Sequence, residues 1–233
     1  MTNKLIAHWK FDGDLTDSSG NGFDGAPSGT LSYVDGKIGQ ALYFNGGNNR
    51  VNLPAMIETA SEVSVGGWIY FEDNAGKNSH FLTATWSWGT TKGFILRRNL
   101  TTAGHDKEFC IVIGHTFYFF DKVLTSDEWF HLFVTNTGTT TKLYINGVLE
   151  QTMTTIPIPY GGGYNSIGAE SVNYHKGMMD DWRIYTGVLS EGEIKAIYFQ
   201  EGTQKKVVSK PYPSPHTNIS ITRTLNAIKR ANG

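Results

Sequence analysis

The sequence predicts an all-β fold, an antiparallel sandwich of short strands with one short closing helix and an extended C-terminal tail. Two observations support this prediction. Short segments in which apolar and polar residues alternate recur between Gly, Asn and Asp residues, as in half-buried strands separated by turns. The composition, with 27 Gly, 13% aromatic and 18% charged residues, has more rings and turn formers than a helical bundle. We therefore exclude helix bundles and coiled coils.

The first strand is predicted over residues 5–11. Apolar side chains stand there at every second position, at Leu5, Ala7, Trp9 and Phe11. Because successive side chains of a strand point to opposite faces, these four share one buried face. The same pattern predicts further strands at residues 41–44, 63–71, 93–97, 109–113, 117–120, 130–135, 141–145 and 181–185. Many short strands of this kind favour an antiparallel sandwich.

A β-hairpin is predicted around Asn146-Gly147. The apolar segments 143–145 and 148–149 flank this dipeptide. Asn and Gly both tolerate the positive φ angles of a type I′ turn, which is the favoured two-residue connection between antiparallel strands. Residues 143–149 are therefore expected to pair with each other.

One helix is predicted, over residues 190–199. Ser190 and Glu193 have the spacing of a capping box, in which each side chain bonds the backbone N–H of the other residue. Ile194, Ile197 and Tyr198 follow at helical spacing and predict one apolar face. This helix would close the domain, which we assign to residues 1–200.

Residues 201–233 are predicted to be an extended tail. They hold six basic residues and one acidic residue, a formal charge of +5 that leaves −6 on residues 1–200. The segment PYPSP at 211–215 favours an extended chain. Three apolar residues at helical spacing could dock on a partner, with basic residues around them; the partner-binding candidates are Ile221, Leu225, Ile228, Lys205, Lys206, Lys210, Arg223, Lys229 and Arg230. A solvated, unstructured end is the alternative.

Charge and hydropathy exclude several classes of partner. Twenty basic and 21 acidic residues give a net charge of −1, so no overall field would attract nucleic acid or an anionic membrane. Apolar runs such as those at 117–120 and 132–134 are far shorter than the ~18 residues of a membrane span. We expect no nucleic-acid partner and no membrane insertion. The single cysteine, Cys110, is expected to be a small buried hydrophobe.

Several motifs resemble the laminin-G-like domains of the concanavalin A-like lectin/glucanase superfamily. In order along the chain they are HWKFDG at 8–13 with LTDSSGNGFDG at 15–25, GQALYFNG at 39–46, EWFHLFVT at 128–135, LYINGVL at 143–149, and MDDWRIY at 179–185 with VLS at 188–190. The resemblance covers residues 5–199 and leaves the tail outside. It implies a jelly roll of two antiparallel sheets, one of them curved. Relatives include lectins, adhesion modules, carbohydrate-binding modules and glucan hydrolases, so the fold alone does not decide the function.

The acidic residues do not favour catalysis. Retaining glucanases on this fold need two carboxylates about 5 to 5.5 Å apart, as on alternate positions of one strand. The sequence offers adjacent pairs instead, whose members point to opposite faces if extended; these are Glu72-Asp73, Asp127-Glu128 and Asp180-Asp181. No Gly-x-Ser-x-Gly segment is present. We therefore expect a protein without enzymatic activity.

A structural Ca²⁺ ion is the one cofactor that the sequence favours. Asp12, Asp17, Asn21 and Asp24 crowd a Gly-rich loop and supply the oxygen ligands that Ca²⁺ prefers. In laminin-G-like relatives this loop often binds calcium with the first acid of the Asp-Asp-x-Arg-Ile-Tyr strand, which implies Asp12, Asn21 and Asp180 here. A tight turn held by its own Asx side chains is an equal alternative. The histidines show no metal-binding spacing, and His131 is expected to be structural.

Aromatic residues in Gly-rich loops are the candidates for sugar contacts. Trp88 is the second tryptophan of the segment TWSWG at 85–89, and Tyr160 and Tyr164 flank three glycines. Rings in such loops could stack on the apolar face of a sugar, although most rings of an all-β protein are buried in its core.

We expect a non-catalytic binding or adhesion module displayed on a large assembly, with a structural protein of a bacteriophage virion as the leading interpretation. Such modules act outside cells, yet the first strand begins about four residues after Met1 without a secretory leader. Virion proteins leave the host by lysis and often use terminal arms to hold neighbouring subunits. The expected partners are virion subunits bound through the tail and a cell-surface glycan, at the surface of an extracellular particle. A secreted lectin-like carbohydrate-binding module is the alternative, and a glycoside hydrolase the third.

Overall fold

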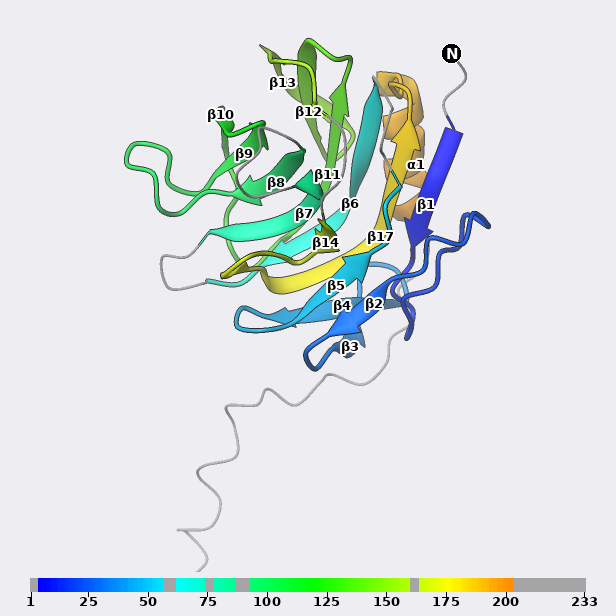
Figure 1. Ribbon diagram of the computed structural model, residues 1–233. Helices are drawn as coiled ribbons and strands as arrows, with labels where there is room; N and C mark the ends of the chain where they lie inside the picture. Colours follow the sequence, from blue (N-terminus) through cyan, green and yellow to red (C-terminus); the bar gives the residue numbers. More distant parts are fainter. Residues whose placement is uncertain (1–3, 57–61, 74–77, 87–92, 160–163, 203–233) are drawn as a thin grey trace, which may run out of the picture.

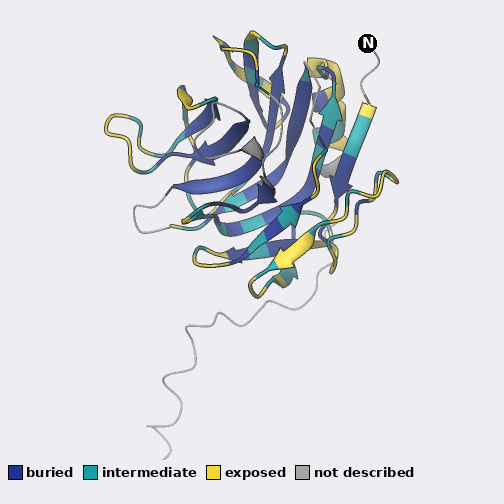
Figure 2. Cartoon of the chain, in the orientation of Figure 1, coloured by how far each residue is buried: buried dark blue, intermediate teal, exposed yellow. Residues whose placement is uncertain are grey.

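The computed structural model describes residues 4–56, 62–73, 78–86, 93–159 and 164–202. Within them two antiparallel sheets pack face to face, and one helix lies on the outside of the first sheet (Figure 1). The predicted all-β sandwich with a closing helix is therefore confirmed. Burial is concentrated on the strands, and the connecting loops at the rim are exposed (Figure 2).

The first sheet carries the longest strand of the fold, β17 (Lys176–Thr186), next to its centre. β17 pairs with β6 on one side and with both β4 and β1 on the other. The sheet has the order β13 (Val148–Thr154), β12 (Thr140–Ile145), β11 (Trp129–Asn136), β6 (Val63–Phe71), β17, β4 (Gln40–Asn45) and β3 (Ser32–Asp35), with β1 (Lys4–Trp9) beside β17.

The second sheet is formed largely by the middle of the chain. Its order is β10 (Thr116–Val123), β9 (Glu108–Ile113), β8 (Phe94–Arg98), β7 (Ser79–Trp86), β14 (Tyr164–Ile167), β5 (Arg50–Leu53) and β2 (Ala26–Ser28). A two-stranded hairpin of β15 (Ala169–Glu170) and β16 (Asn173–Tyr174) follows β14 and lies against β7. This hairpin shapes the outer face of the second sheet.

The core lies between the two sheets and contains the alternate side chains predicted for the first strand. Ala7, Trp9 and Phe11 are buried there, whereas Leu5 is only half-buried because the register of β1 against β17 shifts between Leu5 and Ala7. Trp9 pairs with Trp182 of β17, and its indole N–H donates a hydrogen bond to the Phe23 carbonyl at 2.9 Å. The aromatic residues of the first motif are thus core residues.

The predicted hairpin is confirmed in detail. β12 and β13 meet at Asn146 and Gly147, which have φ values of 52° and 76°. A β-carbon on Gly147 would stand 3.1 Å from the ring of Tyr198, so the turn also packs closely against the helix.

The helix, α1, spans Glu191–Gly202 and so ends three residues after the predicted boundary at Phe199. The Ser190 backbone N–H donates to Glu193 Oε2 at 2.7 Å, and the Glu193 N–H donates to Ser190 Oγ at 3.3 Å, as a capping box requires. Ile194 packs with Phe133 of β11. The helix therefore covers the outer face of the first sheet, whereas the outer face of the second sheet carries a pocket.

Candidate functional site

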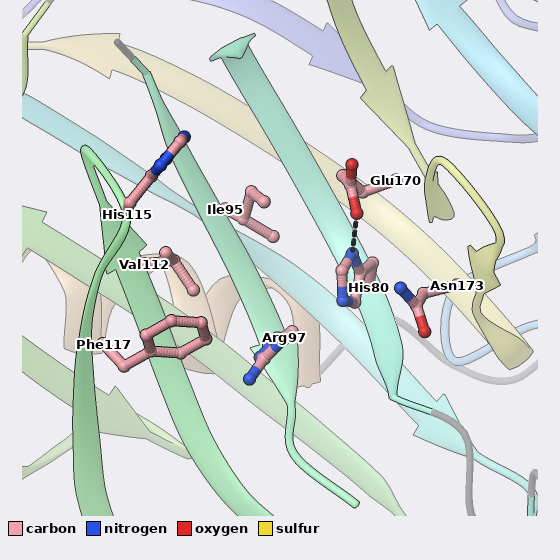
Figure 3. A pocket seen from close by; sticks show the side chains of 8 residues that line it. All are labelled: His80, Ile95, Arg97, Val112, His115, Phe117, Glu170 and Asn173. Atoms are coloured by element: carbon pink, nitrogen blue, oxygen red, sulfur yellow. Dashed lines mark ion pairs between the residues drawn. The ribbon is translucent and has the colours of Figure 1, made fainter. Parts of the chain in front are cut away.

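A pocket of about 280 Å³ lies on the outer face of the second sheet (Figure 3). Residues of β8 alternate between the core and this face: Phe94 and Leu96 pack between the sheets, while Ile95 and Arg97 line the pocket. The pocket is therefore built on rigid strands, with one wall supplied by the β15–β16 hairpin.

One side of the pocket is mostly apolar, with His115 at its edge. Ile95 and Val112 are register partners on β8 and β9, and with Cys110 they form a small cluster separate from the main core. Phe117 of β10 stands beside them with 49% of its surface exposed. An exposed ring at the rim of a pocket offers a flat apolar surface to a ligand.

Arg97 lies between the two sides of the pocket. Its guanidinium carbon is 4.8 Å from the centre of the Phe117 ring, a cation–π distance. Its Nη2 donates a hydrogen bond to Asn99 Oδ1 at 3.1 Å, and Asn99 in turn donates to the His105 carbonyl at 2.8 Å. These contacts hold the guanidinium in one orientation.

The opposite side of the pocket is polar. His80 projects from β7, Glu170 from β15 and Asn173 from β16, and Figure 3 shows all three across the pocket from Phe117. His80 Nδ1 lies 3.7 Å from Glu170 Oε2. Burial, with the charge of Arg97, lowers the pKa of His80 to about 3. His80 is thus neutral at pH 7, and its contact with Glu170, the dashed line in Figure 3, is an ion pair only when the ring is protonated.

This arrangement is suited to an amphipathic ligand. Ligand sites are typically lined by apolar side chains with a few placed polar groups, and here the two kinds face each other. A sugar has an apolar face of C–H groups and an edge of hydroxyls, so it could lie on Phe117 and bond the polar side. Among the described residues that line the pocket, Glu170 is the one carboxylate.

The sequence predictions did not identify this pocket. Trp88 and Tyr160 lie outside the described residues, and Tyr164 opens β14, where its backbone pairs with Trp86. The described residues that flank these loops, Gly93 and Pro159, are joined by a backbone hydrogen bond of 2.8 Å. The role of the three predicted aromatic residues therefore stays a prediction.

One local signal could have pointed to the pocket. His80 and Arg97 are polar residues inside strands whose other members are mostly apolar, which is unusual unless they face a site. Glu170 and Asn173 carry no such signal, because they belong to two-residue strands that are recognisable only in the folded chain.

Two of the three residues proposed to bind calcium, Asp12 and Asp180, accept hydrogen bonds from the same turn, residues 36–40. Asp12 Oδ1 accepts a hydrogen bond from the Gln40 N–H at 2.8 Å, and Asp180 Oδ2 accepts one from the Ile38 N–H at 2.8 Å. A β-carbon on Gly39 would stand 2.2 Å from Asp12 Oδ1, and one on Gly36 would stand 2.6 Å from Asp180 Oδ2. Glycine at both positions lets the turn approach the two carboxylates.

One of the two carboxylate oxygens of Asp180 is buried without a hydrogen-bond partner among the described residues. This oxygen is Oδ1, and the residue as a whole is fully buried. Burial, with the nearby charges of Asp181 and Asp12, raises the pKa of Asp180 to about 8. Because a buried charge is costly without compensation, a cation held by Asp12 and Asp180 fits this place.

Asn21 does not lie with these two carboxylates. Its Nδ2 donates to the carbonyls of Leu5 and Ile6, at 3.1 and 2.9 Å, near the start of β1, whereas Asp12 follows the end of that strand. Among the described residues, no group of three or more His, Cys, Asp or Glu side chains could hold a metal ion. A calcium site here would therefore need ligands beyond the acidic side chains.

The loop around Asn21 is organised by Asp17. Asp17 Oδ1 accepts from the backbone N–H groups of His8 and Ser19, both at 2.9 Å, and Oδ2 accepts from Phe23 N–H at 3.0 Å. Burial alone would raise the pKa of Asp17, but these hydrogen bonds lower it. The Asx-rich turn considered above thus exists, and it holds itself together.

His131 is a structural residue, as predicted. It is fully buried on β11, where its ring centre is 5.0 Å from that of Trp68 and 5.5 Å from that of Tyr198. Burial, with the charge of Arg183, lowers its pKa to about 3. Cys110 is likewise buried, as predicted, and burial raises the pKa of its thiol to about 11.

The predicted attachment residues lie outside the described residues. They all belong to residues 203–233 and include Ile221, Leu225 and Ile228 with the basic residues around them.

Within the described part of the chain, no helix has both the length and the apolar character that crossing a membrane requires.

Comparison with solved structures gives many matches of the same fold. Domain 4 of AbnA, a GH43 extracellular arabinanase from Geobacillus stearothermophilus solved in complex with arabinotriose, has a TM-score of 0.71 and 26% identity; the match covers 85% of this chain and all of that one. The binding domain of Paraclostridial Mosquitocidal Protein 1 has a TM-score of 0.65 and 16% identity. The receptor-binding domain of botulinum neurotoxin C/D mosaic serotype has a TM-score of 0.64 and 17% identity.

The two toxin domains match over 84% of this chain, which spans about half of their length, so their likeness concerns the fold alone. No curated protein sequence matches the chain significantly. The laminin-G family model described as the Concanavalin A-like lectin/glucanases superfamily matches residues 45–195, which is more than half of the chain. With the two antiparallel sheets described above, this match assigns the chain to the concanavalin A-like lectin/glucanase superfamily.

Proposed function

We propose that the chain is a non-catalytic carbohydrate-binding module and that the pocket on the outer face of the second sheet binds one sugar unit of a glycan. The observation that carries the proposal is the two-sided lining, with Phe117 and Ile95 facing His80, Glu170 and Asn173. An apolar ring face and a hydroxyl edge of one sugar would meet these two sides at once. The strands fix both sides, so little ordering is needed on binding.

The comparison with Domain 4 of AbnA supports a sugar ligand. That domain was solved in complex with arabinotriose, and this chain covers it completely. Because the identity is 26%, the particular sugar is not carried over to this chain. Glu170 is the one carboxylate among the described residues of the pocket lining, and this supports binding without hydrolysis, which in retaining and inverting enzymes uses two carboxylates.

A blocking substitution tests this proposal. Ile95→Trp would fill the pocket from its floor, whereas Val148→Trp places the same ring on the exposed β12–β13 turn as a matched control. On a glycan array, the unsubstituted protein and Val148→Trp should bind the same glycans, and Ile95→Trp should lose them. Absence of binding by the unsubstituted protein, or unchanged binding by a folded Ile95→Trp, would contradict the proposal.

We also propose that the module is displayed on a large assembly such as a bacteriophage virion, through residues 203–233. The support is the charge segregation, +5 on residues 201–233 against −6 on the rest. If Leu225 and Ile228 are buried in the contact, each contributes about 1.5 to 3 kcal/mol, more than an exposed basic residue contributes. Leu225→Ser with Ile228→Ser should then release the protein from sedimented particles even at low salt. If the double variant stays fully bound to the particles, the attachment runs through the sandwich instead.

The alternative context is a secreted lectin-like module. It would use the same pocket and would differ only in what the basic segment binds. If the protein binds glycan but does not sediment with any particle, this alternative is favoured.

For the calcium ion, we propose Asp12 and Asp180 as the side chains that would hold it, next to the 36–40 turn. The support is the buried, unpartnered Oδ1 of Asp180 beside a second carboxylate. The ion would be structural, since it would fix this turn against β17 and compensate two negative charges.

A further inference from the structure

The pocket contains a buried cation without a compensating acid. Arg97 is only 7% exposed, and none of the described carboxylates forms an ion pair with it. Its partners are the Asn99 side chain, the Phe117 ring and the thiol of Cys110, all of them uncharged. Burying a charge without an opposite charge is costly, so such a group usually serves a purpose in a site.

The neighbouring arginine shows the contrast. Arg98 points to the other side of β8, over the ring of Phe71, and is fully buried. Burial lowers its pKa, but the charges of three surrounding acids, Asp73, Asp106 and Asp127, oppose this effect. Three acids thus act on the charge of Arg98, whereas no described carboxylate forms an ion pair with the adjacent Arg97. Glu170, which lines the same pocket, is instead in contact with His80.

We infer that the pocket selects an anionic sugar, a glycan unit that carries a carboxylate, and that Arg97 is the residue that recognises it. This inference rests on the proposed carbohydrate-binding function and adds the chemical class of the ligand. Arginine is the side chain best matched to a carboxylate, through charge-assisted and often paired N–H···O bonds.

The surrounding residues assign an orientation to such a ligand. The carboxylate would lie at Arg97, next to the neutral ring of His80, which can donate a hydrogen bond without adding a charge. The apolar face of the sugar would lie against Phe117, which Arg97 already contacts. Glu170 stands on the far side of His80 and would accept hydroxyl groups. Because Glu170 repels a second anion, the pocket would admit one carboxylate in one orientation.

Pairs of glycans that differ only in the carboxylate test the inference. Polysaccharides of uronic acids, such as polygalacturonate, alginate and hyaluronan, are compared with the same preparations after chemical reduction of the carboxyl groups to hydroxymethyl groups. Arabinotriose and neutral galactan complete the panel. Binding is measured by affinity electrophoresis and by calorimetry with oligosaccharides cut from the preferred polymer.

We expect at least one acidic polymer to bind about tenfold or more tightly than its reduced form, because only the carboxylate can form a charge-assisted hydrogen bond with Arg97. Equal or tighter binding of the reduced or neutral glycans would overturn this inference and leave the proposed function standing. Failure of every glycan to bind would contradict both. These outcomes need only the unsubstituted protein, so they do not depend on the folding of a variant.

Substitutions then assign the preference to one residue. Arg97→Gln should remove the difference between the acidic glycan and its reduced form, while Arg97→Lys should retain part of it. Arg50→Gln, on β5 of the same sheet but outside the pocket lining, is the matched control and should keep the full difference. A folded Arg97→Gln protein that keeps the preference would show that another group recognises the carboxylate.

Discussion

The guanidinium of Arg97 lies over the ring of Phe117, 4.8 Å from its centre, on a face of the sandwich that α1, the helix of the described residues, does not cover. This contact joins the charged and the apolar part of the pocket, and each residue restrains the other. Phe117 is half-exposed, so its ring is available to a ligand before binding. The pocket is therefore expected to bind with little rearrangement of its strands.

Phe117→Ala should weaken glycan binding about tenfold, because the ligand loses the apolar surface on which it rests. A gain of about 1.4 kcal/mol corresponds to a tenfold change in affinity, and a half-exposed phenylalanine that becomes covered contributes about that much. Val123→Ala is the control, since Val123 lies on the same strand with 48% exposure, outside the pocket lining. Measured by calorimetry, the glycan affinity of Phe117→Ala should be lower than that of Val123→Ala. Equal affinities would show that Phe117 does not contact the ligand.

The domain should lose stability as the pH falls from about 6.5 toward 3. Burial lowers the pKa of His80, His131 and His175 to about 3 in the folded protein, while the unfolded chain takes up protons near pH 6.5. Their contribution is therefore fully present above pH 6.5 and is lost as the pH falls through this window. The slope per histidine is about 1.4 kcal/mol per pH unit.

Denaturant unfolding at a series of pH values measures this loss of stability. NMR follows the protonation of each histidine separately. The Hε1 resonances of the three histidines should not shift between pH 7.5 and 5 in the folded protein. A midpoint near 6.5 for any of them would contradict the buried, neutral state described for that residue.

Calcium should raise the melting temperature, and Asp180→Asn should abolish the effect. An ion that binds only the folded state stabilises it by about 2.7 kcal/mol at a hundredfold excess over its Kd. Asp14→Asn is the control, because Asp14 is exposed and bonds only the Thr16 N–H of its own loop. An unchanged transition in excess chelator, from protein that initially contained calcium, would refute the site. If calcium still raises the melting temperature of Asp180→Asn, the ion binds at another place in the protein.

A chain that ends at Gln204 should fold and melt cooperatively. The core clusters and α1 all lie within residues 4–202, so the truncation removes no buried side chain of the described sandwich. The melting temperature should change by no more than about 2 °C. An aggregated or molten product would show that residues 205–233 belong to the domain.

Local chemistry made some elements predictable from the sequence. The Asn146-Gly147 turn and the Ser190/Glu193 capping box appear as expected because each is specified by neighbouring residues alone. The alternation in residues 5–11 identified the buried Trp9 for the same reason. Even there, the register shift at Leu5 could not be foreseen, because it depends on pairing with β17.

Other elements depend on partners distant in the sequence. The sequence predicts β17 only over 181–185. In the structure the strand begins at Lys176 and continues through Asp180 and Asp181 with an irregular register and a φ of 52° at Asp181. β13 extends well beyond the predicted residues 148–149, as an edge strand with alternate polar residues. Such strands form because a neighbour offers hydrogen bonds, which no local pattern records.

The candidate site was the least predictable part. His80 and Glu170 face each other only because the β15–β16 hairpin packs on β7. Sequence patterns directed attention to aromatic residues in glycine-rich loops, whereas the described pocket lies on strands. The pairing of Asp12 with Asp180 was indicated by the family resemblance, but the position of Asn21 at the other end of β1 was not.

The most direct test of the central claim is to map the bound glycan on the protein by NMR. The isotope-labelled domain is titrated with the tightest oligosaccharide from the panel, and backbone amide shifts are followed to saturation. The account predicts that the largest shifts fall on β7 to β10 and on the β15–β16 hairpin, around His80, Arg97, Phe117 and Glu170. Shifts confined to the first sheet, α1 or the 36–40 turn, with this pocket unaffected, would contradict it.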